Sequence, residues 1–276
     1  MENRRVICFG GAGSIGSELV RQLCQKNDVF MLDNNETEFF NLHEELRQKG
    51  YAVTGRIGDV RDYQTVDAVI GDFQPDTIFI ASALKHVTPN EWEPVEAVKT
   101  NILGIDNIIR SAKQWGVHTL VHISTDKVVN GESVMGLTKK IAERIVKNAG
   151  YVSVRFGNVL GSRGSVVPIW QRQIEANEPL TVTDKRAERY MMTIPEAVEL
   201  VIKAAEIGRP GQILIMDMGT TINIYQLALD ILKKANKEAL GVKMIGLRPG
   251  EAITERLMTD EEAAKAKRVE NFYVIG

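Results

Sequence analysis

The sequence predicts an α/β fold, a doubly wound parallel sheet with a smaller C-terminal lobe. Short runs rich in β-branched residues alternate with amphipathic stretches along the first half of the chain. The runs are almost continuously apolar, which is typical of parallel strands covered by helices on both faces. Alternation of such strands with helices predicts one parallel sheet wound in both directions.

Each element has its own segment of sequence. The predicted strands are RVICFG (5–10), VFMLD (29–33), YAVTGRIGD (51–59), DTIFIAS (76–82), HTLVHIST (118–125) and YVSVRFG (151–157). The predicted helices cover residues 14–27, 36–49, 63–73, 94–115 and 134–148, where apolar residues recur at helical spacing.

The strand–helix rhythm ends near Gly157, where glycine and proline begin to punctuate the chain. Residues 1–157 are therefore expected to form the core. Residues 158–276 are expected to form a substrate lobe that does not fold independently. A helix over 193–207 and the strand QILIMD (212–217) are expected to return to the main sheet.

Composition excludes several classes of protein. The chain has 276 residues, 44% hydrophobic and 25% charged, with a formal net charge of −2, values typical of a globular protein. Charges of both signs are interspersed, which argues against nucleic acid as a partner. Cys8 and Cys24 lack metal-ligand spacing, so we expect no metal site and reduced thiols in the cytoplasm. No apolar run approaches the roughly 20 residues that span a bilayer, so a soluble protein is expected.

A glycine-rich turn, GGAGSIG, follows the first predicted strand and opens the first helix. Gly10, Gly13 and Gly16 have the GxxGxxG spacing that gives a tight turn, room for a pyrophosphate and close helix packing. Ser14 and Ile15 begin the helix whose N-terminus would face the phosphates. No lysine follows the last glycine, so this is not a nucleoside-triphosphate loop.

Asp33 ends the second strand, where a carboxylate would hold the adenosine ribose hydroxyls of a dinucleotide. The following residues, NNETE, include Asn34 and Asn35 but no cation for a ribose 2′-phosphate, which favours NAD over NADP. Asp59 and Val60 end the third strand and could flank the adenine. An ordinary strand-end turn explains these two residues equally well.

The residues STDK (124–127) and VMGLTKK (134–140) indicate an acid–base site in which one part is absent. Asp126 and Lys127 follow the fifth strand, at the edge where such a sheet binds ligands. Met135 and Lys139 share one helix face, yet a thioether cannot exchange a proton. The alternatives are a turn capped by Asp126, a core methionine and a solvated lysine.

With the longer motif RFGNVLGSRGSVVP and the segments ALKHV, EAVKTNILG, LTVTD, MMTIPEAVELV and GLRPGE, the chain resembles the extended short-chain dehydrogenase/reductases. It is most similar to UDP-N-acetylglucosamine 4,6-dehydratases of the polysaccharide-biosynthesis branch. The resemblance covers nearly the whole chain. Most relatives have a catalytic tyrosine where this chain has Met135, and a sub-branch of often longer, membrane-anchored proteins has methionine. Ala252 stands where lysine is usual, which puts one polar contact near the uridine in doubt.

The resemblance implies a lyase that oxidises sugar C4, eliminates water across C5–C6 and returns the hydride to C6, with NAD regenerated. Lys127 would take the C5 proton and Asp126 would protonate the leaving C6 hydroxyl. Lys127 would then need a lowered pKa, which we expect from repulsion by Lys139 and the oxidised nicotinamide. Without a tyrosine, another group or a water must deprotonate O4, and Asp126 is the first choice. Methionine at position 135 favours retention at C5, giving UDP-2-acetamido-2,6-dideoxy-α-D-xylo-hexos-4-ulose.

The resemblance also assigns the remaining site residues and leaves other functions open. The alternatives are a C5-inverting dehydratase, a UDP-sugar 4-epimerase and a non-catalytic protein that binds NAD and a UDP-sugar. A homo-oligomer is expected. Thr125 joins the catalytic group; Ala81, Ala83, Lys85, Asn101 and Lys139 join the cofactor site; Lys85, Asn158, Arg163, Val166, Thr181, Arg189, Arg248 and Glu251 are expected around UDP-N-acetylglucosamine.

Overall fold

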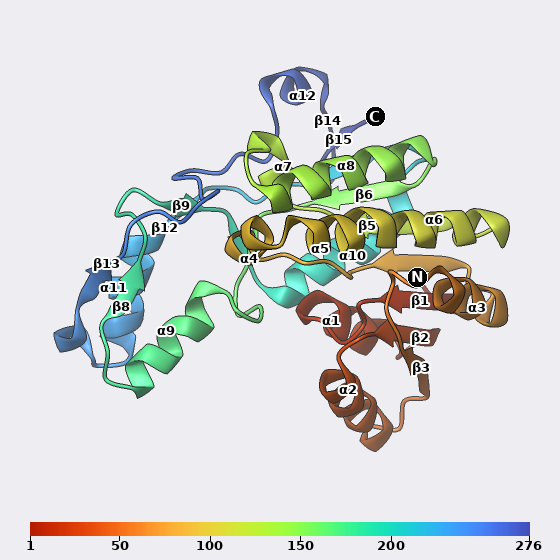
Figure 1. The fold of residues 1–276 in the computed structure, drawn as a ribbon, viewed down its shortest axis with the longest axis horizontal. Coiled ribbons are helices and arrows are strands. Elements are labelled where there is room, and N and C mark those ends of the chain that lie inside the picture. The colour runs from red at the N-terminus through yellow and green to blue at the C-terminus, as the bar shows by residue number, and fades with distance from the viewer.

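The computed structural model describes residues 1–276 and contains one nine-stranded sheet of order β14-β15-β11-β6-β5-β4-β1-β2-β3 (Figure 1). The seven strands from β11 to β3 pair in parallel, which confirms the predicted fold class. Strands β15 and β14 add an antiparallel edge. The strands are β1 (Arg5–Phe9), β2 (Asp28–Asp33), β3 (Val53–Ile57), β4 (Thr77–Ile80), β5 (Thr119–Ile123), β6 (Val152–Arg155), β11 (Ile213–Met216), β14 (Lys267–Val269) and β15 (Phe272–Ile275).

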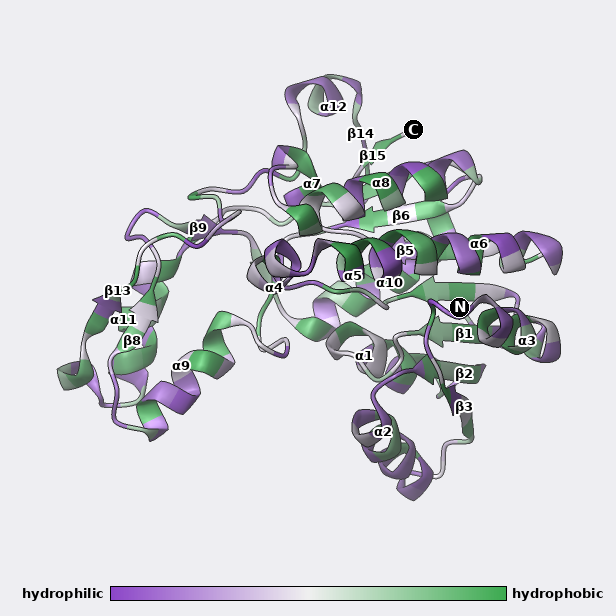
Figure 2. Cartoon of the chain, viewed as in Figure 1, coloured by the Kyte–Doolittle hydropathy of each residue, from purple (hydrophilic) through white to green (hydrophobic).

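Helices cover both faces of the sheet, and each face has its own apolar core. On one face pack α1 (Ser14–Leu23), α2 (Glu36–Gln48) and α10 (Ile194–Ile207). On the other pack α3 (Tyr63–Phe73), α6 (Gly104–Gln114) and α8 (Val134–Asn148). Strands β5 and β6 between them are coloured mainly as hydrophobic in Figure 2, as strands buried on both faces should be.

The predicted helix over 94–115 is divided. Helix α4 (Val87–Trp92) precedes α5 (Pro94–Val98), a π-helical turn η1 (Lys99–Leu103) and α6. The π turn places Asn101 inside the protein, where its side chain amide bonds to the backbone of Leu84 and to Thr138. The irregular turn therefore fixes the loop after β4 against α8.

A second, smaller group of elements lies to one side of the sheet (Figure 1). Its small core includes Trp170, Leu180 and Ile224, and Trp170 Nε1 donates to the Thr181 carbonyl at 2.8 Å. The elements outside the main sheet and its helices are α7 (Lys127–Asn130), β7 (Asn158–Val159), α9 (Val166–Glu175), β8 (Leu180–Val182), β9 (Glu188–Arg189), β10 (Met191–Met192), β12 (Ile222–Asn223), α11 (Ile224–Lys234), η2 (Glu238–Leu240), β13 (Val242–Met244) and α12 (Asp260–Lys265).

The chain returns to the main sheet twice. Helix α10 and strand β11 occupy the segment 193–217 that the sequence places there. Residues 267–275 also join the sheet, as β14 and β15, although the sequence assigns them to the C-terminal lobe. These strands are three and four residues long, too short for a strong period-two pattern. No helix of the structure has the length and apolar character needed to cross a bilayer.

Candidate active site

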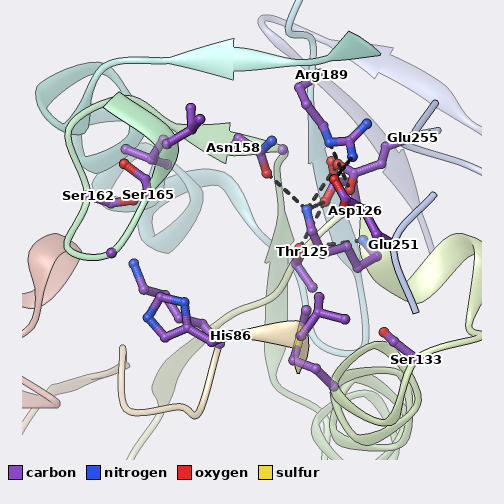
Figure 3. Close-up of a pocket in the computed structure, with 18 of the residues that line it drawn as sticks. His86, Thr125, Asp126, Ser133, Asn158, Ser162, Ser165, Arg189, Glu251 and Glu255 are labelled. Atoms are coloured by element: carbon purple, nitrogen blue, oxygen red, sulfur yellow. Dashed lines mark hydrogen bonds and ion pairs between the residues drawn. The ribbon is translucent and has the colours of Figure 1, made fainter. Parts of the chain in front are cut away.

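A cavity of about 930 Å³ lies between the carboxyl ends of the sheet strands and the smaller lobe. Its walls come from the glycine-rich turn, the loops after β4 and β5, the start of α8, and the segments around 156–167 and 248–255. Figure 3 shows Asp126, Asn158, Arg189 and Glu255 converging on one side of this cavity. The sheet edge that the sequence selects is therefore the edge that carries the cavity.

The glycine-rich turn is compatible only with glycine at two of its three spaced positions. A Cβ on Gly10 would lie 2.4 Å from the Ser82 nitrogen, and Gly10 has a φ of 78°. A Cβ on Gly16 would lie 1.9 Å from the Gly10 carbonyl oxygen. Gly13 precedes α1 directly, and Gly13, Ser14 and Ile15 line the cavity. The bare backbone and helix N-terminus fit a pyrophosphate.

Asp33 fixes this turn from the end of β2. One carboxylate oxygen accepts from the Ala12 backbone N–H and the other from that of Asn35, each at 2.9 Å. The Asn35 side chain caps α2 by accepting from Glu38 N–H, so it is engaged within the protein. These contacts arrange the binding surface for a dinucleotide. Some predicted cofactor residues do not line the cavity: Gly10, Gly16, Asp33, Asn34, Asn35, Asp59, Val60 and Asn101.

Asp59, expected near the adenine, and Arg163, expected at the diphosphate, both have side chains paired with other protein groups. Asp59 is ion-paired with Arg61, whose Nε donates to it at 2.8 Å. Arg163, expected at the diphosphate, donates to the Ala12 carbonyl and lies 3.3 Å from the Glu38 carboxylate. Arg163 thus brings a positive charge to the segment after β2, where the local sequence has no lysine or arginine. The Glu38 carboxylate pairs with this charge.

Lys127 is the centre of a buried charged cluster. Its Nζ lies 3.0 Å from Asp126 Oδ1, 3.0 Å from Glu255 Oε2 and 2.9 Å from Asn158 Oδ1. The Asp126 side chain is fully buried, and its Oδ2 has no hydrogen-bond partner. Thr125 Oγ1 donates to Asp126 Oδ1 at 2.9 Å. The cluster joins α7 to segments far away in sequence.

The two carboxylates determine the charge of Lys127. Burial alone would lower the pKa of Lys127, but the charges of Asp126 and Glu255 raise it overall. Burial would raise the pKa of Asp126, but Lys127 and the surrounding hydrogen bonds lower it. The sequence predicts a lowered pKa for Lys127. In the structure its contacts with Asp126 and Glu255 favour the ammonium form and raise this pKa, and no local sequence pattern places Glu255 beside Lys127.

Lys139 has a different environment in the same cavity. Its Nζ contacts His122 Nε2 at 2.8 Å and donates to the Ile123 carbonyl. Burial lowers the pKa of Lys139 to about 8, although Glu143 opposes the shift. Burial and the Lys139 charge hold the pKa of His122 well below its usual value, so its imidazole is neutral. His122 Nδ1 contacts Ser153 Oγ at 3.2 Å.

Met135 lies in the first turn of α8 and lines the cavity together with Lys139. Ser133 begins this helix by accepting from Gly136 N–H at 3.1 Å. A Cβ on Gly136 would lie 2.4 Å from the Lys127 carbonyl oxygen, so glycine allows α8 to approach α7 closely. Met135 is only 2% exposed. Its thioether cannot exchange a proton, so this position supplies no acid or base.

Most of the predicted substrate residues line the cavity, but one of them, Arg189, is bound to other protein groups. Both terminal nitrogens of Arg189 are engaged by the protein, because they donate to the carbonyls of Glu188, Ile253 and Ala252 and to the Glu251 carboxylate. Arg189 therefore organises the 248–255 segment. Seven of the eight predicted substrate residues line the cavity, all except Arg163: Lys85, Asn158, Val166, Thr181, Arg189, Arg248 and Glu251.

Ala81, Ala83 and Lys85 line the cavity beside the glycine-rich turn. Burial, followed by the charge of Arg163, lowers the pKa of Lys85. The structure contains no group of three or more His, Cys, Asp or Glu residues arranged to hold a metal ion.

The chain matches, over residues 6–276, the family described as "Polysaccharide biosynthesis protein". It is 38% identical over 288 residues to the capsular polysaccharide biosynthesis protein CapD of Staphylococcus aureus, with 99% of this chain and 48% of CapD aligned. The chain belongs to this polysaccharide biosynthesis family. It spans about half the length of CapD.

Other relatives match over most of their own length. A Rickettsia bellii protein named UDP-glucose 4-epimerase is 34% identical over 99% of this chain and 83% of its own. The X-ray structure of Pen from Bacillus thuringiensis has a TM-score of 0.95 and 35% identity, covering 99% of this chain and 89% of Pen. The family resemblance stated from the sequence is confirmed, and both dehydratase and epimerase names occur among structures with this fold.

Two residues of the site have no local sequence signal. Glu255 lies 128 positions from Lys127, and no periodic pattern links the two. His122 lies inside an apolar strand, where a buried structural histidine is the ordinary interpretation. An interior polar residue in a strand that leads into the site is the only signal that could have drawn attention to it.

Proposed function

We propose that the chain is an NAD-dependent nucleotide-sugar 4,6-dehydratase that acts on UDP-N-acetylglucosamine with retention at C5. The observation that carries the proposal is the buried cluster of Lys127 with two carboxylates on the cavity wall. A lysine and an acid side by side can take a carbon-bound proton and protonate a leaving hydroxyl. Membership of the polysaccharide biosynthesis family agrees with a nucleotide-sugar substrate.

The residues present fit NAD. The turn containing Gly10, Gly13 and Gly16 would hold the pyrophosphate, Asp33 the adenosine ribose, and Lys139 the nicotinamide ribose. The chemistry that NAD supplies is removal of a hydride from C4 and its return to C6. A structure of Thermus thermophilus UDP-glucose 4-epimerase, 25% identical with a TM-score of 0.79, is described in complex with NAD. Nucleotide extracted from the purified protein should be NAD, and NADP as the main species would contradict this.

The chain's own residues carry the protons. Asp126 is ionised at neutral pH because its pKa is lowered, and it belongs to the cavity lining beside Lys127, so we assign it the deprotonation of O4. The same carboxyl group then protonates the leaving O6, which closes the cycle without a tyrosine. Lys127 removes the C5 proton and returns it to the same face, which gives retention.

A 4-epimerase is the second candidate, because the Rickettsia relative has that name. An epimerase returns the hydride to C4 and requires no acid–base pair at C5 and C6. The site instead places Asp126, Lys127 and Glu255 together, with all three side chains at most 22% exposed. This cluster favours elimination.

We also propose that the chain forms a homo-oligomer through α5, η1 and α8, which pack against one another. Val95, Leu103, Leu137 and Ile141 are 61%, 51%, 45% and 46% exposed on these elements. Exposed apolar side chains on elements that pack together indicate an interface, and a second copy is the simplest partner. Sedimentation of the purified chain should show an oligomer, and replacement of Ile141 by Asp should weaken it. A cytoplasmic location stays a prediction from the sequence.

Incubation with UDP-N-acetylglucosamine, followed by chromatography and mass analysis, tests the proposed activity. The dehydratase should yield a product lighter by one water. An epimerase should give a new chromatographic species of unchanged mass. Recovery of unaltered sugar, with the nucleotide shown to bind, would indicate a binding protein and overturn the proposal.

A further inference from the structure

Glu255 is a buried carboxyl group in direct contact with the lysine of the site. Its side chain is 7% exposed, and its Oε2 lies 3.0 Å from Lys127 Nζ. Glu255 Oε1 lies 3.5 Å from Arg189 Nε. In Figure 3 its side chain points toward Asp126 and Arg189. The contact is thus part of the acid–base cluster.

The position of Glu255 is fixed from both sides. Before it, Arg189 donates to the carbonyls of Ala252 and Ile253, each at 2.8 Å. After it, Arg155 donates to the Leu257 carbonyl at 3.0 Å. Two buried guanidinium groups therefore hold the segment, so Glu255 meets Lys127 in a defined geometry.

The cluster poses a proton problem. Lys127 can remove the C5 proton only as a neutral amine, yet two carboxylates stabilise its ammonium form. Its surplus proton must move to a neighbouring group that can hold it. Asp126 is committed to the oxygen atoms of the substrate, Asn158 offers only an amide, and Arg189 is already cationic. Glu255 is the remaining acceptor in contact with Lys127 Nζ.

We propose that Glu255 is the proton partner of Lys127, accepting the ammonium proton before C5 is deprotonated and returning it after C5 is reprotonated. This inference rests on the proposed dehydratase function. Burial and the adjacent Asp126 charge, partly opposed by Lys127 and Arg189, raise the pKa of Glu255 to about 7. A carboxyl group that titrates near neutrality can exchange a proton in either direction at little cost.

The proton count of this scheme closes. The cycle begins with Asp126 and Glu255 ionised and Lys127 protonated. Asp126 takes the O4 proton, and the Lys127 proton moves to Glu255. Neutral Lys127 then takes the C5 proton, while Asp126 protonates O6 and water leaves. Lys127 returns its proton to C5, and Glu255 reprotonates Lys127, so the starting state is restored.

The test compares Glu255→Gln with Glu255→Asp and Glu261→Gln. Glutamine keeps the size and polarity of Glu255 but cannot accept the proton, so turnover should fall by about 10²-fold with little change in KM. Aspartate keeps the carboxylate and should recover part of the loss. Glu261 lies on α12 with its side chain 81% exposed, so its glutamine variant should match the unaltered protein.

The pH profile separates proton transfer from a structural role. In the unaltered protein turnover should fall as pH drops through about 7, because Glu255 must be ionised to accept the proton. This limb should disappear in Glu255→Gln. Turnover of Glu255→Gln at the rate of the unaltered protein, or an unchanged pH profile, would overturn the inference. If the unaltered protein itself forms no dehydrated sugar, the proposed function fails instead.

Discussion

Lys127 and Lys139 line the same cavity, yet their surroundings give them opposite properties. Burial disfavours the charged form of both. Two carboxylates, Asp126 and Glu255, contact Lys127 and raise its pKa. Lys139 contacts a neutral imidazole and a backbone carbonyl, and its pKa is lowered to about 8. Burial alone lowers the pKa of a lysine, as at Lys139, and contacting carboxylates reverse that direction, as at Lys127.

We infer that the two lysines have different roles. Lys127 can exchange a proton with the contacting carboxyl groups of Asp126 and Glu255, which suits proton transfer at C5. Lys139 has no contacting carboxylate, so we propose that it donates hydrogen bonds and places a positive charge in the cofactor site.

Replacement of Lys127 by Met should cause the largest loss. The variant keeps the length of the side chain but removes the C5 base, so dehydration should fall by about 10³-fold or more. Product formation from UDP-N-acetylglucosamine measures this, with a thermal shift on UDP addition as a check that the nucleotide still binds. Dehydration close to the rate of the unaltered protein would end the assignment of Lys127.

Replacement of Lys139 by Met should reveal its lowered pKa in stability. The folded pKa of Lys139, about 8, lies below its unfolded value near 10.4. The unfolded chain thus binds more protons between these values, and the unfolding free energy of the unaltered protein rises with pH there. The methionine variant lacks this cost, on the order of 3 kcal/mol at neutral pH.

Chemical denaturation at pH 7 and pH 10 measures the effect of Lys139→Met. The stability difference between the methionine variant and the unaltered protein should favour the variant more at pH 7 than at pH 10. Lys147, which is exposed on the same helix, offers a matched control for the loss of one lysine, and its methionine variant is measured at the same two pH values. Equal differences at the two pH values would contradict a lowered pKa.

Met135→Tyr should have a smaller effect. If Asp126 deprotonates O4, a phenol at position 135 adds no needed function, and its extra volume crowds a side chain that is 2% exposed. Turnover should stay the same or fall by about 10-fold. A large rate increase in steady-state assays would show that the tyrosine role was vacant and that Asp126 does not replace it.

His122→Gln should give the smallest change. The amide can still accept from Lys139 but cannot mimic the rigid imidazole that also contacts Ser153. We expect a modest shift in the alkaline limb of the pH profile and little change elsewhere. An effect as large as that of Lys127→Met would mean that the Lys139 contacts matter as much as the carboxylate cluster.

The sequence could predict the fold because strand and helix periods are local. The helix over 134–148 appears in the structure as α8 with the same ends. The segment 94–115 has a helical pattern throughout, so the π turn at Lys99–Leu103 could not be foreseen. It forms because Asn101 bonds to Leu84 and Thr138, which are distant in sequence.

The site was predictable in its residue types but not in its contacts. Thr125, Asp126, Lys127 and Lys139 follow from motifs within two short segments. The charge of Lys127 depends on Glu255, which reaches it through a loop held by Arg155 and Arg189. Arginines expected at the substrate are thus engaged by the protein itself, and the direction of the Lys127 pKa shift depends on a carboxylate that the sequence does not place beside it.

Exchange at C5 of the 4-keto product tests the central claim most directly. The product already carries the C4 ketone, so its C5 proton can exchange with deuterated solvent without oxidation of the sugar. With NAD added, the unaltered protein and Lys139→Met should both introduce deuterium at C5 with retained configuration, as read by NMR. Lys127→Met should not exceed the uncatalysed exchange. Exchange by Lys127→Met at the rate of the unaltered protein, or an inverted C5 centre, would contradict the account.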